Sequence, residues 1–260
     1  MSVTAIEPRV EEVDPHLVLN GIPWEQYVAI NDALPERRGL RMTYIDGSLT
    51  LLTGSRRHDW FADSMDSIIK AVGVGCELDM EIAGSATFRL EGEKVGVEGD
   101  RTYYFGEHAA IMRGPIDIDR ATQPPPDLAI EVEYPHPAHK AVATYARMGV
   151  PEVWRYDVRK GKMAFLALGQ DGAYEPVERS RNLPLLKPED VLFQLKLVDE
   201  IGPFPRWSIQ LHVHRLDLRR THRLLRRGSM VDPRSFRRET LCVDRPQGHH
   251  LDSPKTFERH

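Results

Sequence analysis

Cysteines and long apolar stretches are scarce in this sequence, and their scarcity limits the kind of protein it can encode. Cys76 and Cys242 are the only cysteines in 260 residues, and neither has a Cys or His close by in the sequence. We therefore expect neither a disulfide framework nor a zinc finger, and a reducing cytoplasm is the default compartment. No run approaches the roughly 18 consecutive apolar residues of a membrane helix. The first residues also lack a basic segment followed by an apolar one. The sequence thus predicts a cytoplasmic protein without a membrane span.

Charge is unevenly distributed along the chain. The formal net charge is -4, but residues 215–260 hold 12 Lys and Arg against 6 Asp and Glu, a net of +6. The remaining 23 basic and 33 acidic residues give residues 1–214 a net charge of -10. Such an acidic body repels nucleic-acid phosphates unless a local basic strip forms on it. The Arg-rich tail could supply nonspecific affinity, or contribute nothing to function.

The pattern of apolar residues indicates one folded domain between two irregular ends. Residues 1–18 are acidic and interrupted by proline, which is typical of an unstructured leader. Residues 19–204 carry regular apolar periodicity and are expected to form a single domain. Residues 205–260 lack the periodicity needed to bury a face, although RLDLRRTHRLLRRG could form a short basic helix, so we expect a basic and largely disordered tail.

Within the domain, helical and strand-like patterns alternate. Asp46-Gly47 lies between two β-rich runs and is a strong hairpin signal. Gly73 and Gly149 each follow a helical pattern and are expected to end it. The spacing predicts helices at 24–34, 58–72, 138–148 and 187–198, and strands around 80–90, 94–105, 127–133, 152–158 and 162–168. This order predicts an α/β or α+β fold, with a mixed sheet flanked by helices.

The stretch PDLAIEVE, residues 126–133, places several carboxylates on one face of a predicted strand. Successive side chains of a strand alternate between faces, so Asp127, Glu131 and Glu133 share a face. Like charges at this spacing disfavour each other and are tolerated when solvated, protonated or holding a cation. One explanation is an ordinary solvated sheet face. The other is a metal site.

A second strand-like segment, VGVEGDRTYY, carries acidic residues in the same way. Glu98 and Asp100 are expected on one of its faces. If this segment lies beside residues 127–133, Asp100 and Glu131 would converge on a divalent cation, Mg²⁺ or Mn²⁺, which takes one or two carboxylates together with waters and phosphate oxygens. Asp127 lies too early on its strand to share that ion.

Several motifs together resemble the Uma-type restriction endonuclease family, a branch of the PD-(D/E)xK nuclease superfamily. They are VGVEGDRTYYFGEH, PPPDLAIEVE and YARMGVPEVWRYD in that order, preceded by the hairpin YIDGSLTLL and then His58. The resemblance covers roughly residues 22–200. It implies a restriction-endonuclease-like core of helix, three-stranded meander, helix and strand. It also implies Mg²⁺-dependent hydrolysis of DNA phosphodiesters, with DNA as the expected partner.

The resemblance assigns roles to two acidic residues. Asp100 matches the aspartate of the PD half-motif and Glu131 the acidic residue of the second half, and both would hold the metal. The proline that precedes the aspartate in the motif is Gly99 here, which changes backbone stiffness but removes no ligand.

Two further departures concern the motif lysine. Glu133 stands at its nominal position, where it could be a further metal ligand or the general base. In the family, the following helix often supplies a basic residue. Its position corresponds to Ala141 in this chain, whereas Lys140 stands one position earlier. One residue turns a helical side chain by about 100°, so Lys140 is either a substitute lysine or an ordinary surface residue.

Other residues have both a functional and a structural interpretation. His58 could approach the phosphate or a metal-bound water, or could be structural. His136 and His139, with Lys140, could contact a phosphate at a helix N-terminus or could be solvated. Trp154 and Tyr156 are expected to be core aromatics and not platforms for base stacking.

Two functions from different classes follow from these observations. The first is a metal-dependent endonuclease in which Asp100 and Glu131 bind the metal, Glu133 assists and Lys140 substitutes for the motif lysine. The second is a catalytically degenerate module that keeps the nuclease fold for binding or interaction. A glycosidase that uses two carboxylates is disfavoured, because nothing else in the sequence suggests a sugar site. A homodimer is compatible with either function.

Overall fold

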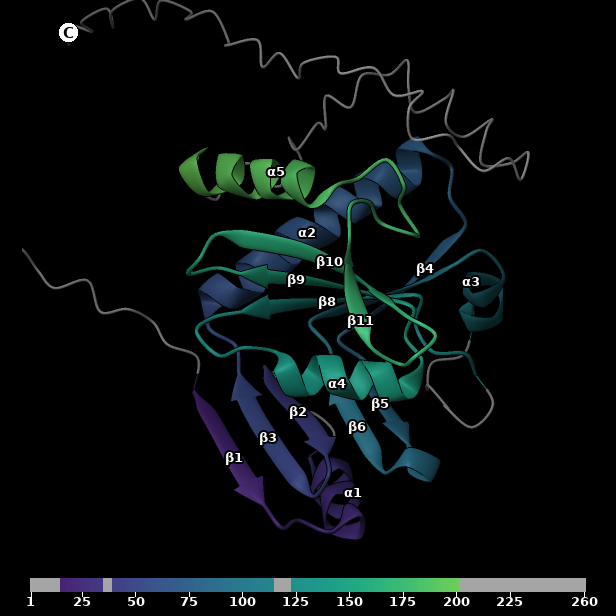
Figure 1. Cartoon of the computed structure of the whole chain (residues 1–260). Helices are drawn as coiled ribbons and strands as arrows, with labels where there is room; N and C mark the ends of the chain where they lie inside the picture. The colour runs from purple at the N-terminus through teal and green to yellow at the C-terminus, as the bar shows by residue number, and fades with distance from the viewer. Residues whose placement is uncertain (1–14, 35–38, 115–122, 202–260) are drawn as a thin grey trace, which may run out of the picture. The chain divides into compact units, whose positions relative to one another are not determined.

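The structure is a computed structural model that describes residues 15–34, 39–114 and 123–201, all within the unit Met1–Leu211. The described residues form two β-sheets with helices packed on them (Figure 1). The five-stranded sheet has the order β1 (His16–Asn20), β3 (Ser48–Thr53), β2 (Leu40–Ile45), β6 (Val95–Glu98) and β5 (Thr87–Leu90). The six-stranded sheet has the order β11 (Tyr174–Val177), β10 (Lys162–Leu168), β9 (Glu152–Asp157), β8 (Leu128–Glu133), β7 (Arg101–Phe105) and β4 (Met80–Gly84). The helices are α1 (Trp24–Ala33), α2 (Arg56–Gly75), α3 (Gly106–Met112), α4 (His139–Met148) and α5 (Pro188–Ile201), with a short 3-10 helix at Glu91–Glu93.

The five-stranded sheet is built around the predicted hairpin. Asp46 and Gly47 have φ values of 49° and 72°, so both turn residues are left-handed, as a tight two-residue hairpin turn requires. Helix α1 covers one face of this sheet through a cluster of buried residues that includes Trp24, Tyr27 and Leu49. The hairpin prediction is confirmed.

The six-stranded sheet contains the core that the family resemblance implies. Strands β4, β7 and β8 pair antiparallel in that order, and β9 then pairs parallel with β8 after the crossover through α4. With α2 before them, these elements give the order helix, three-stranded meander, helix and strand. β5 and β6 are inserted within the meander and join the other sheet. The predicted mixed sheet flanked by helices is confirmed.

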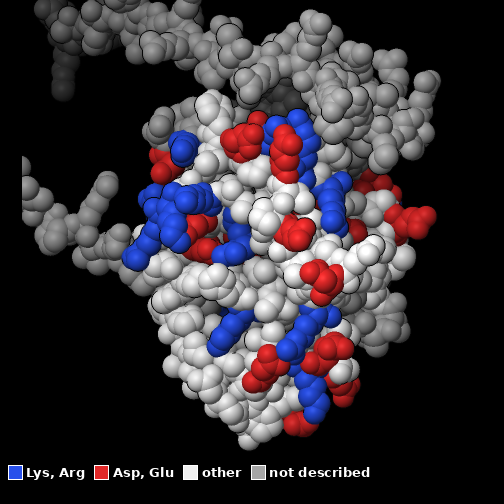
Figure 2. Space-filling model, in the orientation of Figure 1, with Lys and Arg blue, Asp and Glu red and all other residues white. Residues whose placement is uncertain are grey.

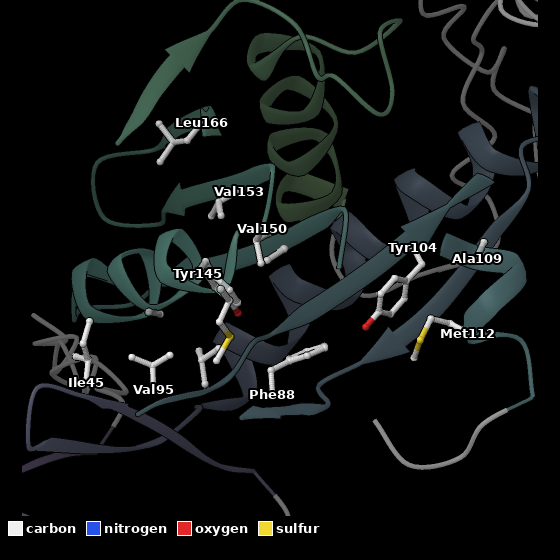
Figure 3. Close-up of a cluster of buried hydrophobic side chains, with 14 residues drawn as sticks. Ile45, Phe88, Val95, Tyr104, Ala109, Met112, Tyr145, Val150, Val153 and Leu166 are labelled. Atoms are coloured by element: carbon white, nitrogen blue, oxygen red, sulfur yellow. The ribbon is translucent and has the colours of Figure 1, made fainter. Parts of the chain in front are cut away.

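Helix α4 lies between the two sheets and packs on both. A buried apolar cluster joins Ile45 and Val97 of the five-stranded sheet, Tyr145 and Met148 of α4, and Val153 of the six-stranded sheet (Figure 3). On the opposite face of the six-stranded sheet, α2 packs on β8 and α5 packs on β10 and α2 (Figure 1). The face of β8 that carries its glutamates is therefore turned towards α4 and not towards solvent.

Some sequence predictions were wrong in their boundaries. Gly73 does not end α2, which continues to Gly75. A Cβ at Gly73 would lie 2.9 Å from Met80 Cε, so the glycine makes room for that side chain. The segments 80–90 and 94–105 are each two strands that belong to different sheets. Residues 16–18, which we expected in the leader, are part of β1. The rest of the predicted leader, residues 1–14, and the predicted tail, residues 205–260, lie outside the described residues. Among the described helices, none is both long and apolar enough to cross a membrane.

Candidate active site

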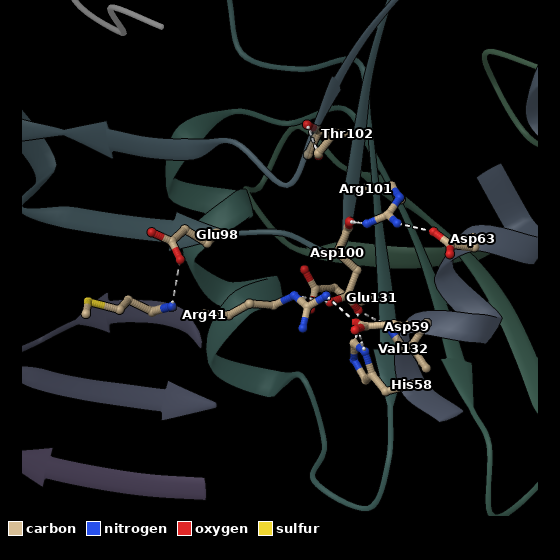
Figure 4. A network of polar contacts seen from close by, with 12 residues as sticks. Arg41, His58, Asp59, Asp63, Glu98, Asp100, Arg101, Thr102, Glu131 and Val132 are labelled. Atoms are coloured by element: carbon tan, nitrogen blue, oxygen red, sulfur yellow. Dashed lines mark hydrogen bonds and ion pairs between the residues drawn. The ribbon is translucent and has the colours of Figure 1, made fainter. Parts of the chain in front are cut away.

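Asp100 and Glu131 face each other across two neighbouring strands. Strand β7 pairs antiparallel with β8, with Arg101 opposite Ile130. One step further along this register, Asp100 stands opposite Glu131, and facing Cα atoms of such a pair lie about 5 Å apart. Figure 4 shows both side chains in one polar network. The two acidic residues that the motifs single out are therefore brought together.

The chain crosses from one sheet to the other just before Asp100, so Glu98 and Asp100 do not share a strand face. Glu98 ends β6, where its carboxylate accepts hydrogen bonds from Thr87 Oγ1 at 2.7 Å and from the backbone N–H of Met42 at 3.2 Å. The predicted pairing of Glu98 with Asp100 on one face is wrong. The reason is that the segment from Val95 to Phe105 is two strands and not one.

The Asp100 carboxylate is buried, with 1% of its surface exposed, and is held by three groups. Oδ2 accepts a hydrogen bond from the backbone N–H of Val132 at 2.7 Å and lies 3.2 Å from His58 Nε2. Oδ1 lies 2.8 Å from Arg41 Nε. Burial alone would raise the pKa of Asp100, but the charges of His58 and Arg41 outweigh it and keep the pKa below its ordinary value. Asp100 is thus ionised and neutralised from two sides.

Arg41 and His58 reach Asp100 from separate elements. Arg41 belongs to β2, and its Nη2 also donates to Asp59 Oδ1 at 2.9 Å. His58 lies in the first turn of α2, which Ser55 caps by accepting a hydrogen bond from the His58 backbone N–H. Burial would lower the pKa of His58, yet the Asp100 charge and the hydrogen bonds to Asp100 and Asp59 raise it to about 10. The site therefore holds two cations at neutral pH.

Gly54 makes the approach of Arg41 possible. A Cβ at this position would overlap Arg41 Nη1 and would lie 3.1 Å from His58 Nδ1 and 3.2 Å from Asp59 Oδ1. The backbone of Gly54 therefore packs directly beneath the guanidinium. A larger residue here would have to displace the Arg41 side chain.

Glu131 has a different environment from Asp100. It is buried, and its Oε1 accepts a hydrogen bond from Tyr145 Oη at 2.7 Å. Burial and the charge of Asp100 raise the pKa of Glu131 to about 8. Gly99 leaves room for this arrangement, because a Cβ there would overlap the Tyr145 hydroxyl and lie 3.5 Å from Glu131 Oε1. At neutral pH the pair is one ionised and one protonated carboxyl group.

Glu133 shares a strand face with Glu131 but binds other partners. Its Oε1 accepts hydrogen bonds from Arg155 Nε at 2.8 Å and from the backbone N–H of Ala138 at 2.9 Å, just before α4. Strand β8 is buried along its whole length, so the solvated strand face is wrong as an explanation of the acidic pattern. The repulsion between the carboxylates on this face is relieved because Glu131 binds a proton and Glu133 pairs with Arg155.

Asp127 lies outside the site, as expected. Its carboxylate accepts a hydrogen bond from the Phe105 backbone N–H at 2.8 Å and pairs with His108 Nδ1 at 2.8 Å. These contacts fix the start of β8 against the end of β7.

The structure does not bring Lys140 to the carboxylate pair. Its Nζ donates to Ser48 Oγ at 2.6 Å, at the β2–β3 hairpin. Ala141, which aligns with the family's helical basic residue, is buried in the cluster between the sheets. His136 stacks on His16 with ring centroids 4.2 Å apart. Contact of His136 or His139 with a phosphate stays a prediction.

Trp154 and Tyr156 are core aromatics, as predicted. Trp154 is fully buried and stacks on Phe165 with ring centroids 4.0 Å apart. Tyr156 packs edge-on against Phe61. Neither presents a face for base stacking.

A cavity of about 370 Å³ opens beside the Asp100 network. Two arginines and two aspartates in its wall form the pairs Arg41–Asp59 and Arg101–Asp63. Arg41 is thus both a partner of Asp100 and part of the wall. Any group that enters this cavity meets the guanidinium of Arg41.

A divalent cation fits the donor chemistry of the site, although only two protein ligands are available. Within the ranges that the structure describes, no three His, Cys, Asp or Glu side chains are grouped so as to hold a metal ion. Mg²⁺, however, commonly takes one or two carboxylates and completes its shell with water and phosphate oxygens. Asp100 and Glu131 provide that number, and a cation would favour the ionised form of Glu131. Arg41 is its competitor at Asp100.

Sequence reasoning missed Arg41 and Tyr145. Arg41 lies 59 positions before Asp100, in an apolar–polar alternation that is typical of any half-buried strand. Tyr145 stands in a helical pattern, at a position that equally suits a core residue. Neither residue carries a local signal of a role at the site.

The fold and the carboxylate pair define a protein with a restriction-endonuclease-like core. A family model described as "Uma2: Putative restriction endonuclease" matches residues 24–200, which is more than half of the chain. The chain therefore belongs to the Uma2 family. Among solved structures, a "putative nuclease belonging to DUF820" from Anabaena variabilis is similar at 14% identity with a TM-score of 0.49, covering 67% of this chain and 99% of that one. No curated protein matched the chain.

Proposed function

We propose that this chain is a nuclease that hydrolyses DNA phosphodiester bonds with a divalent ion, Mg²⁺ or Mn²⁺, held by Asp100 and Glu131. The observation that carries the proposal is the buried pair itself, in which burial and the charge of Asp100 raise the pKa of Glu131 to about 8. Two carboxyl groups forced together in this way are typical of a functional site. Membership of the Uma2 family supports the nuclease class.

The residues of this chain prepare the site for a phosphate and its metal. Bound Mg²⁺ would act as a Lewis acid on the phosphoryl oxygen and lower the pKa of a bound water. Asp100 is kept ionised and oriented by Val132, His58 and Arg41. Tyr145 orients Glu131 through the hydrogen bond to its Oε1. Each ligand is thus fixed by contacts made before any metal arrives.

We propose that Arg41 supplies the positive charge that the motif lysine would supply. Lys140 is engaged by Ser48, whereas the Arg41 guanidinium borders both Asp100 and the cavity. Arg41 would offset negative charge on the phosphate, as a lysine does in related sites. Glu133 acts indirectly, because it binds Arg155 and the segment before α4.

Cleavage of supercoiled plasmid DNA in Mg²⁺ or Mn²⁺ tests this proposal. We expect cleavage by the wild-type chain, and a loss of at least 100-fold in Asp100→Asn and Glu131→Gln, with circular dichroism confirming that both variants fold. Asp32→Asn is the matched control, because this exposed carboxylate pairs with Arg89 on the surface. Plasmid cleavage that is equally fast in all four proteins would contradict the assignment.

The second candidate, a degenerate binding module, is favoured by one specific observation. Ala141 stands where the family has a basic residue, and Lys140 is directed to Ser48. A calorimetric titration with Mn²⁺ separates the two candidates. The degenerate module is favoured if the chain binds DNA but neither binds Mn²⁺ at millimolar concentration nor cleaves the plasmid.

A further inference from the structure

A group of basic residues, which we name the basic rim, lies where α2 begins and where β9 turns into β10. Its exposed members are Arg56 and Arg57 in the first turn of α2, Arg159 and Lys160 in the turn, and Lys162 at the start of β10, with the partly buried Arg155 on β9. Figure 2 shows Lys and Arg gathered on the side of the molecule where Figure 1 places these two elements. The rim joins parts of the chain that are about 100 residues apart.

Contacts between the two elements show that the rim is one surface. Tyr156 of β9 packs edge-on against Phe61 of α2, and Arg57 lies over the same Phe61 ring at 5.4 Å. The charges of Arg57 and Asp157 both act on the pKa of Tyr156. The start of α2 and the β9–β10 turn therefore lie close enough to present their basic residues to a single ligand.

The rim keeps an excess of positive charge after its internal ion pairs are counted. Lys160 pairs with Asp157 at 2.8 Å, Arg57 pairs with Asp199 at 3.2 Å, and Arg155 pairs with Glu133. The exposed Arg56 and Lys162 add positive charge to these three pairs. This excess stands on a chain whose residues 1–214 carry -10. It is the kind of local basic strip that an acidic body needs in order to bind phosphates.

The rim also adjoins the candidate active site. Arg57 is followed directly by His58, which contacts Asp100, and then by Asp59, which lines the cavity. At the other end, Arg155 binds Glu133, two residues after Glu131. A polyanion that lies along the rim is thereby brought beside the Asp100–Glu131 pair.

We propose that the basic rim binds the phosphodiester backbone of duplex DNA and directs it to the Asp100–Glu131 pair. The choice of DNA as the ligand rests on the proposed function. Surface lysines and arginines recognise phosphates without reading bases, so this binding is independent of sequence. Its strength falls steeply with salt, because each neutralised phosphate releases counterions.

The test compares two triple variants of the full chain with equal loss of charge. The rim variant is Arg159→Gln, Lys160→Gln and Lys162→Gln. The control variant is Lys70→Gln, Arg89→Gln and Arg113→Gln, three surface residues that each pair with an aspartate away from the rim. Both variants keep residues 215–260, so a difference in DNA affinity between them is due to the rim residues.

Binding is measured by fluorescence anisotropy of a labelled 20-base-pair duplex in EDTA, between 50 and 200 mM NaCl, so that no cleavage occurs. For the rim variant we expect binding about tenfold weaker or more, with a salt slope lower by about two to three, since each phosphate contact contributes about 0.9. The control variant should bind within twofold of wild type. Thermal melting confirms that both variants fold.

Three other results for DNA and vesicle binding would overturn the proposal. Equal weakening in both variants would mean that only total charge matters, and unchanged binding by the rim variant would place the DNA elsewhere. Binding to vesicles with 25% phosphatidylserine that is lost in the rim variant, while DNA binding persists, would assign the rim to a lipid surface. If the wild type never cleaves DNA but binds it through the rim, the nuclease proposal fails and this one stands. If DNA is cleaved normally and the rim variant binds DNA as well as the wild type does, the nuclease proposal stands and the rim proposal fails.

Discussion

Replacing Glu131 by glutamine should stabilise the protein, and the gain should grow with pH. Glutamine keeps the size of the side chain and an oxygen that can accept the Tyr145 hydrogen bond, but it cannot ionise. The pKa of Glu131 is raised from 4.5 to about 8 by burial and by the charge of Asp100. Below pH 4.5 the carboxyl group is protonated in both the folded and the unfolded chain. It then contributes nothing to the pH dependence.

Between pH 4.5 and 8 the two states differ in proton binding. The unfolded chain releases the Glu131 proton while the folded chain retains it, so the folded state loses about 1.4 kcal/mol of relative stability per pH unit. The loss reaches about 3 kcal/mol at pH 7 and levels off above pH 8. The glutamine variant does not suffer this loss. Other groups, His58 among them, are common to both proteins and cancel in the comparison.

Urea unfolding of both proteins at pH 4.5, 6, 7 and 8 measures the difference directly. We expect the two free energies of unfolding to be similar at pH 4.5 and the variant to be more stable by about 3 kcal/mol at pH 7. Glu175→Gln, at an exposed position of β11, controls for the loss of one negative charge. A difference between wild type and Glu131→Gln that stays constant across this pH range would refute the reasoning, because it would mean that Glu131 is ionised in the folded protein at neutral pH.

Three further predictions follow from the contacts at the site. Gly99→Ala should lower stability by about 1–3 kcal/mol, because the new Cβ overlaps the tyrosine hydroxyl that binds Glu131. Gly92→Ala, whose Cβ meets nothing within 4 Å, should leave the melting temperature nearly unchanged. Asp100→Asn should cost about 3–5 kcal/mol in urea unfolding, since it removes the buried carboxylate that Arg41 and His58 share, and a cost below 1 kcal/mol would contradict that view. Lys140→Ala should leave the rate of plasmid cleavage within twofold of wild type, and a larger loss would restore it as the substitute lysine.

Local chemistry made much of the fold predictable. The turn at Asp46 and Gly47 and the helix end at Gly149 need left-handed backbone, and the sequence places suitable residues at both positions. The mixed sheet flanked by helices followed from the order of the elements, and its parallel pair is β8 with β9. The division of 80–90 and 94–105 between two sheets did not, because alternation reports which side chains share a face and not which strand pairs with which.

The site was predictable only where a motif marks it. Asp100 and Glu131 were found from two acidic positions on strand-like segments and from the family resemblance. Arg41 and Tyr145 were not found, because their contacts join residues far apart in sequence or use a helix position that equally suits a core residue. Gly99 was expected only to change backbone stiffness, whereas its effect is to make room for Tyr145.

The charges at the site explain how a buried acidic pair is stable without a metal. Near pH 7, Asp100 and Asp59 are negative, Glu131 is protonated, and both Arg41 and His58 are positive, so these five groups are close to neutral together. A neutral site of this kind does not by itself attract a free divalent cation. Once a phosphate occupies the cavity beside Arg41, the local charge becomes negative and a divalent ion is favoured. Because coupling between two ligands is reciprocal, DNA and metal should then each strengthen the binding of the other. Under the proposed function, the guanidinium that would compete with a metal at Asp100 would also attract the phosphate that completes the shell of the metal.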